Sequence, residues 1–141
     1  MEHTVNVLKD RIEWRYKNKL HRTDRPAVEY IDGDKFWYQN GKLHRTDGPA
    51  IEYVNGYKAW YQNGKLHRTD GPAVEYPDGS ESWYQNGKLH RTDGPAIEWP
   101  EWPNGVKEWW IDDKQLTEEE FLAKTNPCAT KKLLSMVRNI G

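Results

Sequence analysis

The chain has 141 residues, 21 Lys and Arg against 22 Asp and Glu, a net charge of −1 and a mean hydropathy of −1.08. This balance excludes the basic surplus typical of proteins that bind nucleic acid or an anionic membrane. Low hydropathy is typical of disorder, but 13% of the residues are aromatic, which indicates a folded protein with buried rings. The length is that of one domain, and the single Cys128 excludes an internal disulfide. With no signal peptide and no long apolar run, we expect a cytoplasmic location without membrane association.

Residues 1–13 form a lead-in to the first repeated pattern. Val5 and Val7 alternate with polar residues, which fits either a strand or a loose end. A degenerate unit then begins at Trp14, in which Asn18 and Arg25 stand where later units have glycine. Terminal units of a repeat array are expected to be atypical, because one side faces solvent or a cap.

One string, Trp-Tyr-Gln-Asn-Gly-Lys-Leu-His-Arg-Thr-Asp-Gly-Pro-Ala, occurs letter for letter at 37–50, 60–73 and 83–96. The period is 23 residues. Such a period is the signature of a repeat protein in which each unit packs mainly on its neighbours. The last unit contains an insertion within 98–105, after which Trp109 resumes the tryptophan position.

Turn signals divide each unit into short strands. Asn55-Gly56 separates two aromatic-rich segments and predicts a two-residue type I′ hairpin turn. Asn63-Gly64 predicts a second such turn, and residues 69–72 lead the chain into the next unit. Every unit is therefore expected to be one piece of an antiparallel meander.

The two turns also predict which residues lie opposite each other. A two-residue loop at Asn55-Gly56 places Ile51 opposite Trp60 and Tyr53 opposite Lys58. The second turn places Leu66 opposite Tyr61 and His67 opposite Trp60. One face is then expected to collect Ile or Val, Tyr, Trp and His, and the other to collect Tyr, Leu and Ala with Glu and Arg.

After residue 116 the pattern becomes helical. Thr117 and Glu120 form a capping box, which predicts a helix to about Lys124 that stops at Asn126-Pro127. A second helix is predicted over roughly 129–139, with Leu133, Leu134 and Val137 on its apolar side. We expect this pair to cover the open edge of the last hairpin, because uncovered edges favour aggregation. Alternatively, the last helix docks on a partner.

These observations predict an all-β repeat protein, a meander of consecutive antiparallel β-hairpins in one elongated twisted sheet, with a short C-terminal α-helical cap. The expected divisions are the lead-in at 1–13, the repeats at 14–116 and the cap at 117–141.

The repeated string and its period resemble MORN-type repeats. The likeness covers roughly residues 14–116 and is greatest to a variant class found in uncharacterised proteins of bacteriophages, large DNA viruses and some bacteria. It implies a row of β-hairpins, a virus-encoded protein, and a role in binding or scaffolding. MORN units have Gly-x-Gly after the histidine, whereas Arg-Thr-Asp-Gly-Pro stands here. Lipid binding, often attributed to MORN proteins, is therefore not carried over.

Each unit contains a His-Arg-x-Asp group, for example His67 to Asp70. Equivalent histidines are expected about 10 Å or more apart from the strand spacing, too far to share a zinc ion. Because one polar set is copied in every unit, whereas an enzyme needs one specialised pocket, we expect no catalytic residue, no metal and no cofactor.

Two interpretations of these polar groups remain open. In the structural one, Arg pairs with Asp or stacks on an aromatic ring, Asp shapes a turn, and His packs on Trp and bonds to backbone. In the functional interpretation, the repeated His, Arg and Trp side chains form a ladder along the array that recognises a repeated or anionic ligand. The candidate binding residues are Trp37, Trp60, Trp83, Trp109, His44, Arg45, His67, Arg68, His90 and Arg91.

The first functional hypothesis is a non-enzymatic protein–protein interaction or adaptor module that acts on a host protein in the host cytoplasm. The second is sequestration of a small anionic or sugar ligand by aromatic and Arg or His residues. A third is a structural assembly role through an open sheet edge. Nucleic acid is not expected, since acidic residues balance the Lys and Arg of each unit. A flat aromatic patch would favour the first hypothesis and a closed pocket the second.

Overall fold

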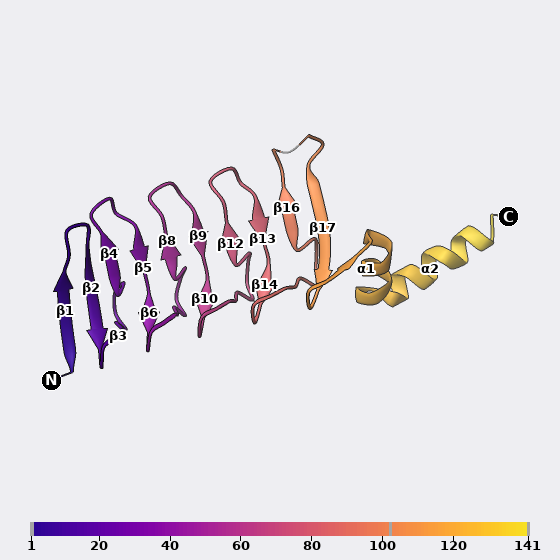
Figure 1. Cartoon of the computed structure of the whole chain (residues 1–141). Coiled ribbons are helices and arrows are strands. Elements are labelled where there is room, and N and C mark those ends of the chain that lie inside the picture. The colour runs from indigo at the N-terminus through magenta and orange to yellow at the C-terminus, as the bar shows by residue number, and fades with distance from the viewer. Residues whose placement is uncertain (1, 102, 141) are drawn as a thin grey trace.

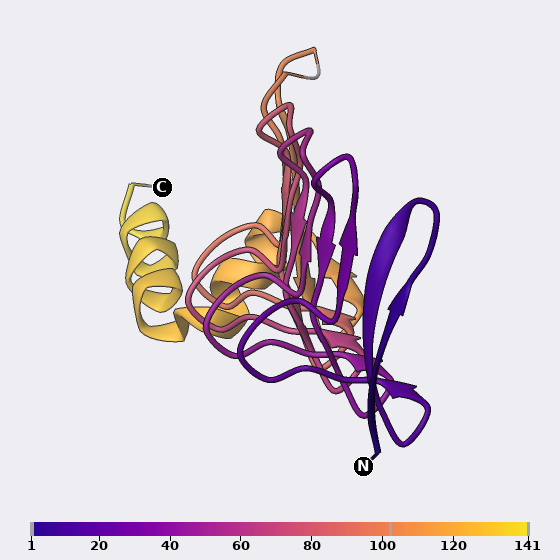
Figure 2. The ribbon, with the colours of Figure 1, turned by 90° about the vertical axis from the view of Figure 1, so that its left-hand side faces the viewer.

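The computed structural model describes residues 2–101 and 103–140 and consists of an elongated row of antiparallel hairpins followed by two helices (Figure 1). The main sheet has the order β1-β2-β4-β5-β8-β9-β12-β13-β16-β17-β18, so its strands lie side by side in chain order. The predicted meander of hairpins with C-terminal helices is confirmed. Seen along the row, successive units nearly overlay, and the N-terminal hairpin is inclined to the others (Figure 2).

Two kinds of hairpin alternate along the chain. The strands of the main sheet are β1 (His3–Val7), β2 (Arg11–Tyr16), β4 (Val28–Tyr30), β5 (Lys35–Phe36), β8 (Ile51–Glu52), β9 (Lys58–Ala59), β12 (Val74–Glu75), β13 (Glu81–Ser82), β16 (Ile97–Trp99), β17 (Val106–Ile111) and β18 (Lys114–Leu116). The strand β3 (Lys19–Leu20), which pairs with β2, and three small hairpins complete the units: β6 (Tyr38–Gln39) with β7 (Lys42–Leu43), β10 (Tyr61–Gln62) with β11 (Lys65–Leu66), and β14 (Tyr84–Gln85) with β15 (Lys88–Leu89).

The turn of each small hairpin forms as predicted. Asn63 and Gly64 both have positive φ, 50° and 77°, as a type I′ turn requires. Tyr61 pairs with Leu66, and the His67 N–H donates to the Trp60 carbonyl at 3.0 Å. Both predicted pairings across this turn are confirmed.

The predicted register across Asn55-Gly56 is wrong by one residue. Ile51 pairs with Ala59 and Glu52 with Lys58, because the loop has three residues. Gly56 has a φ of 98°, whereas Asn55 is not left-handed; its Oδ1 instead accepts from the Tyr57 N–H at 2.9 Å. The Tyr53 N–H still donates to the Tyr57 carbonyl at 3.0 Å, which closes a three-residue hairpin loop.

This shift reassigns the two faces of the sheet. Ile51, Ala59 and Val74 form a buried cluster, and Leu and Tyr side chains of the small hairpins pack against it. The tryptophan that opens each repeated string, for example Trp60, lies instead with Arg68 and Glu75 on the opposite face, so the prediction that Ile51 and Trp60 share a face is incorrect. Four alanines at the strand ends are completely buried: Ala27, Ala50, Ala73 and Ala96.

Backbone bonds join each small hairpin to the next. The Gly64 N–H donates to the Leu43 carbonyl at 2.8 Å, and the Arg45 N–H donates to the Tyr61 carbonyl at 3.0 Å. The same two bonds recur one unit later, from Gly87 and Arg68. Each unit therefore contacts its neighbours through the main sheet and through this second row of hydrogen bonds, as expected for a repeat array.

The two ends of the row differ. The N-terminal lead-in is a strand, β1, whose five residues are all exposed. At the other end, helix α1 (Glu118–Thr125) has the predicted capping box at Thr117, contacts β17 and β18, and buries Phe121. Helix α2 (Pro127–Arg138) starts two residues earlier than expected, since Asn126 accepts from the Ala129 N–H and proline occupies the first turn.

Candidate functional site

Each full unit places an arginine over its tryptophan. The guanidinium carbon of Arg68 lies 4.0 Å from the centre of the Trp60 ring. Its Nε lies 2.9 Å from Asp70, and its Nη1 lies 3.0 Å from Glu75 and donates to the Pro72 carbonyl at 3.1 Å. The same contacts recur at Arg45 and Arg91. The structural interpretation of the arginine, ion pairing and ring stacking together, is confirmed.

The glycine of the Asp-Gly-Pro segment makes room for this arginine. A Cβ on Gly71 would lie 2.6 Å from the Arg68 guanidinium carbon, and the corresponding distances at Gly48 and Gly94 are 2.8 and 2.9 Å. None of the three has the positive φ of a left-handed turn, so the glycine serves close approach rather than turn geometry.

The degenerate first unit shows the consequence of losing that glycine. Arg25 occupies its place, and Arg22 still stacks on Trp14 at 4.1 Å. Its bond to the Pro26 carbonyl lengthens to 3.4 Å, and its distance to Asp24 is also 3.4 Å. Among the described residues Arg22 makes no ion pair with Glu29, the counterpart of Glu75.

The histidines join neighbouring units. His44 accepts from the Asn63 N–H through Nδ1 at 3.0 Å, and His67 accepts from the Asn86 N–H at the same distance. His90 closes the series by accepting from the Asp112 N–H at 3.3 Å. The predicted backbone hydrogen bond of the histidine is confirmed. No group of three metal-ligating side chains occurs within residues 2–101 and 103–140.

An open groove brings four of the candidate binding residues together. It has a volume of about 590 Å³ and lies between successive Arg-Thr-Asp-Gly loops, where Arg45, Trp60, His67 and Arg68 contribute to its walls. Each of its arginines already faces two carboxylates. Hydrogen bonding to Arg68 lowers the pKa of the Asp70 carboxyl below its usual value. Recognition of an anion by this ladder remains a prediction.

Two other candidate tryptophans each have a distinguishing feature. Trp109 is half-buried in β17 and pairs with Leu116, and no arginine stacks on its ring within the described chain. Trp83 carries the stacked Arg91, and its indole Nε1 is buried without a hydrogen-bond partner among the described residues.

A second row of rings lies on the other face of the sheet. Consecutive centroid distances of 5.6, 5.7, 5.2 and 5.5 Å join Tyr30, Phe36, Tyr53, Tyr57 and Tyr76. Burial raises the pKa of Tyr57 to about 12. Tyr53 and Tyr76 are 38% and 41% exposed, so part of this row faces solvent. The sequence predicts tyrosine on both faces but not this continuous row, which depends on the three-residue loop register.

Helix α2 presents an unpartnered apolar side. No residue of the helix is buried, and Leu133, Leu134, Met136 and Val137 are 55–67% exposed. The helix contacts α1 and extends away from the row (Figure 1). The expectation that both helices cover the sheet edge therefore holds only for α1. No helix in the described part of the chain is long and apolar enough to cross a membrane.

Comparisons with protein-family models, with curated proteins and with solved structures found no match to this chain.

Proposed function

We propose that this protein is a non-enzymatic protein–protein interaction module whose helix α2 docks in a groove of a partner protein. The exposed apolar side of α2 carries the proposal. Exposure of the Leu133, Leu134, Met136 and Val137 side chains to water is unfavourable. An exposed apolar patch of this kind is typical of an interaction site. An amphipathic helix seated in a hydrophobic groove is a recurrent mode of recognition.

The charge of α2 indicates the chemistry of the partner. Lys131, Lys132 and Arg138 lie on the helix, and residues 121–141 contain no Asp or Glu. The repeats, in contrast, oppose each ladder arginine with carboxylates. A groove that is complementary to this basic, one-sidedly apolar helix has an apolar floor and an acidic rim. Such charge complementarity favours rapid association as well as the correct orientation.

The row of hairpins then acts as a rigid body that holds α2. Helix α1 anchors the end of the row through the buried Phe121, and α2 follows it directly. The resemblance to viral repeat proteins supports a virus-encoded adaptor acting on a host protein in the host cytoplasm. Sequestration of an anion has weaker support, because the arginines of the groove at Arg45 and Arg68 are already neutralised.

The test compares two double variants of α2 with equal charge and equal spacing. Leu133→Asn with Val137→Asn destroys the apolar side, whereas Ser135→Gln with Asn139→Gln places two amide side chains on the polar side and leaves the charge unchanged. Tagged proteins are recovered from host lysate and examined by native mass spectrometry and crosslinking. We expect a stoichiometric host protein, crosslinked to Lys131 or Lys132, with the wild type and the control but not with the apolar-side variant.

Three results would count against the proposal. A partner retained by the apolar-side variant would place the interface elsewhere. Recovery of only further copies of this chain would indicate self-assembly through β1 or α2. Binding of the wild type, but not the apolar-side variant, to phosphatidylserine vesicles with no protein partner would indicate a membrane surface instead.

A further inference from the structure

The aromatic row on the sheet stops in the fourth hairpin. Ser82 pairs with Val74 as Ala59 pairs with Ile51, so Ser80 stands where Tyr57 stands one unit earlier. Ser80 is buried and carries no ring to continue the row beyond Tyr76. The repeat pattern is therefore interrupted at Ser80.

A second departure lies directly across from Ser80. Trp60 and Trp83 are 23 residues apart, whereas Trp83 and Trp109 are 26 apart, and the additional residues lengthen the loop between β16 and β17. Trp99, at the end of β16, occupies the position of Tyr76 and pairs with Val106. The longer loop carries Glu101.

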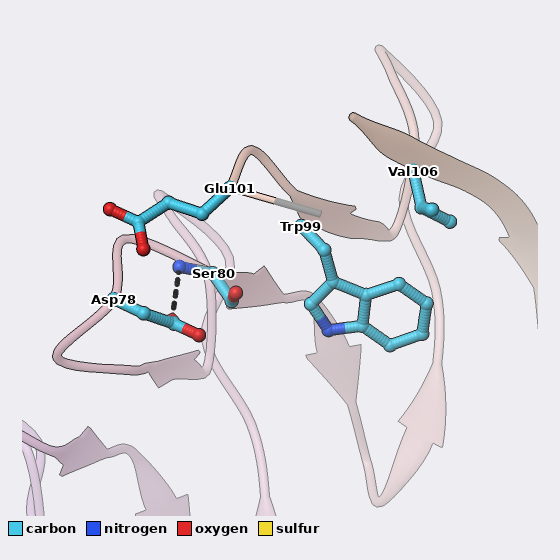
Figure 3. A pocket seen from close by; sticks show the side chains of 5 residues that line it. All are labelled: Asp78, Ser80, Trp99, Glu101 and Val106. Carbon is cyan, nitrogen blue, oxygen red and sulfur yellow. Dashed lines mark hydrogen bonds between the residues drawn. The ribbon is translucent and has the colours of Figure 1, made fainter. Parts of the chain in front are cut away.

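The two departures together create a pocket of about 670 Å³ (Figure 3). Its described lining consists of Asp78, Ser80, Trp99, Glu101 and Val106. Figure 3 shows the two carboxylates and the serine on one side and the indole ring and Val106 on the other. Other units have no counterpart to this combination of side chains.

The chemistry of the lining is that of a cation site. The described lining of the pocket contains no Lys, Arg or His, so no side chain of the lining neutralises the two carboxylates. The Ser80 N–H donates to Asp78 Oδ1 at 2.9 Å, and this bond and the Ser80 hydroxyl hold the pKa of Asp78 below its usual value. The other side of the pocket is formed by Trp99 and Val106, and Trp99 is 36% exposed. An indole ring attracts a cation through its face, and carboxylates orient the N–H groups of that cation.

We propose that this pocket binds an organic cation, an alkylammonium or guanidinium group, placed over the Trp99 indole and paired with Asp78 and Glu101. A metal ion would not use the indole wall, whereas an alkylammonium group uses every side of the pocket. The cation is either a free amine or a Lys or Arg side chain of a protein, and both present the same chemistry. The site does not depend on the docking of α2.

The test is a titration of the full chain, labelled with ¹⁵N, followed by NMR at the Trp99 indole N–H and at the Ser80 backbone N–H. The probes are n-butylammonium and two peptides with blocked termini, the cationic Gly-Lys-Gly and the neutral Gly-norleucine-Gly, all at equal ionic strength. Because Asp78 and Glu101 are exposed, we expect a Kd on the order of 1 mM for the cations. The neutral peptide should cause no saturable shift.

Matched variants separate the charge of Asp78 within the pocket from the net charge of the chain. Asp78→Asn and Glu101→Gln should each weaken cation binding about three- to five-fold, as expected for exposed charge contacts. Asp32→Asn is the control, because Asp32 Oδ1 accepts from the Asp34 N–H at 3.1 Å in the equivalent turn of the first unit. Ser80→Tyr restores the residue of the preceding unit and should abolish binding by filling the gap.

Equal shifts with the neutral peptide would overturn the proposal, as would unchanged affinity in both Asp78→Asn and Glu101→Gln. An equal loss in Asp32→Asn would also overturn it, because Asp32 does not line the pocket and the effect would then come from the net charge of the chain. Tighter binding of the lysine peptide than of n-butylammonium would identify a protein side chain as the source, and equal binding would identify a free amine. Either of these two results supports the cation site. If the apolar-side variant of α2 still recovers a partner, the proposed docking of α2 fails, but the result of these titrations does not change.

Discussion

The contacts of Arg68 predict how much one arginine of the ladder contributes to stability. Arg68→Ala removes a stacking contact at 4.0 Å, an ion pair with Glu75 at 3.0 Å and a bond to the Pro72 carbonyl at 3.1 Å. The Arg68 side chain is 22% exposed, and each of these three contacts contributes about 1 kcal/mol. The pair with Asp70 adds little, since that carboxylate side chain is 83% exposed. Recovered rotamer entropy offsets about 1 kcal/mol, so we expect a net loss of about 2 kcal/mol.

Arg22 is the matched control within the same chain. It keeps a stacking contact, at 4.1 Å, but its carbonyl bond and its ion pair are both lengthened to 3.4 Å. We therefore expect Arg22→Ala to cost only about 0.5 kcal/mol. Arg68→Lys retains the charge but loses the planar group that stacks on Trp60 and binds two partners, so it should recover less than half of the loss.

Urea unfolding of the three variants, followed by tryptophan fluorescence and by far-UV circular dichroism, measures these differences if the m-values stay equal. An equal loss for Arg22→Ala and Arg68→Ala would contradict this expectation, because the two sites differ in contacts but not in residue type. Wild-type stability of Arg68→Lys would show that charge alone matters.

The remaining predictions concern three other features of the fold. Gly71→Ala should cost about 1 to 2 kcal/mol in urea unfolding, because its Cβ would displace Arg68, and it should cost much less in an Arg68→Ala background. Burial raises the pKa of Tyr57 from its ordinary 10.0 to about 12. The contribution of the neutral phenol to stability is therefore complete below pH 10 and is lost as the pH rises through 12. The Tyr57→Phe variant should show a smaller fall in urea midpoint between pH 9 and 11.5 than the wild type. Phe121→Ala should lower the unfolding free energy by about 3 kcal/mol, whereas removal of 127–141 should change it by less than about 0.5 kcal/mol, because α2 buries no residue. A large loss on removing α2 would mean that the helix supports the fold.

Features that depend on local chemistry can be predicted from the sequence. The 23-residue period predicted a row of hairpins, since identical strings fold into identical units that pack on each other. Asn63-Gly64 predicted its turn, and Thr117 with Glu120 predicted the start of α1, because these residues satisfy backbone groups within a few positions. The N-terminal segment fits either a strand or a loose end by sequence, and pairing with β2 makes it a strand.

Tertiary contacts decided the faces and therefore the candidate sites. Asn55-Gly56 is compatible with a loop of two or three residues; in the folded protein Asp34 of the preceding unit accepts from the Val54 N–H at 2.8 Å, alongside the three-residue loop. That single register step moves every side chain of the following strand to the other face. It separates tryptophan from isoleucine, aligns the tyrosines in one row and makes Ser80 an interruption of that row. The amino-acid sequence alone determines the repeat. Which rings and charges share a surface is decided by contacts with the neighbouring unit, because those contacts set the strand register.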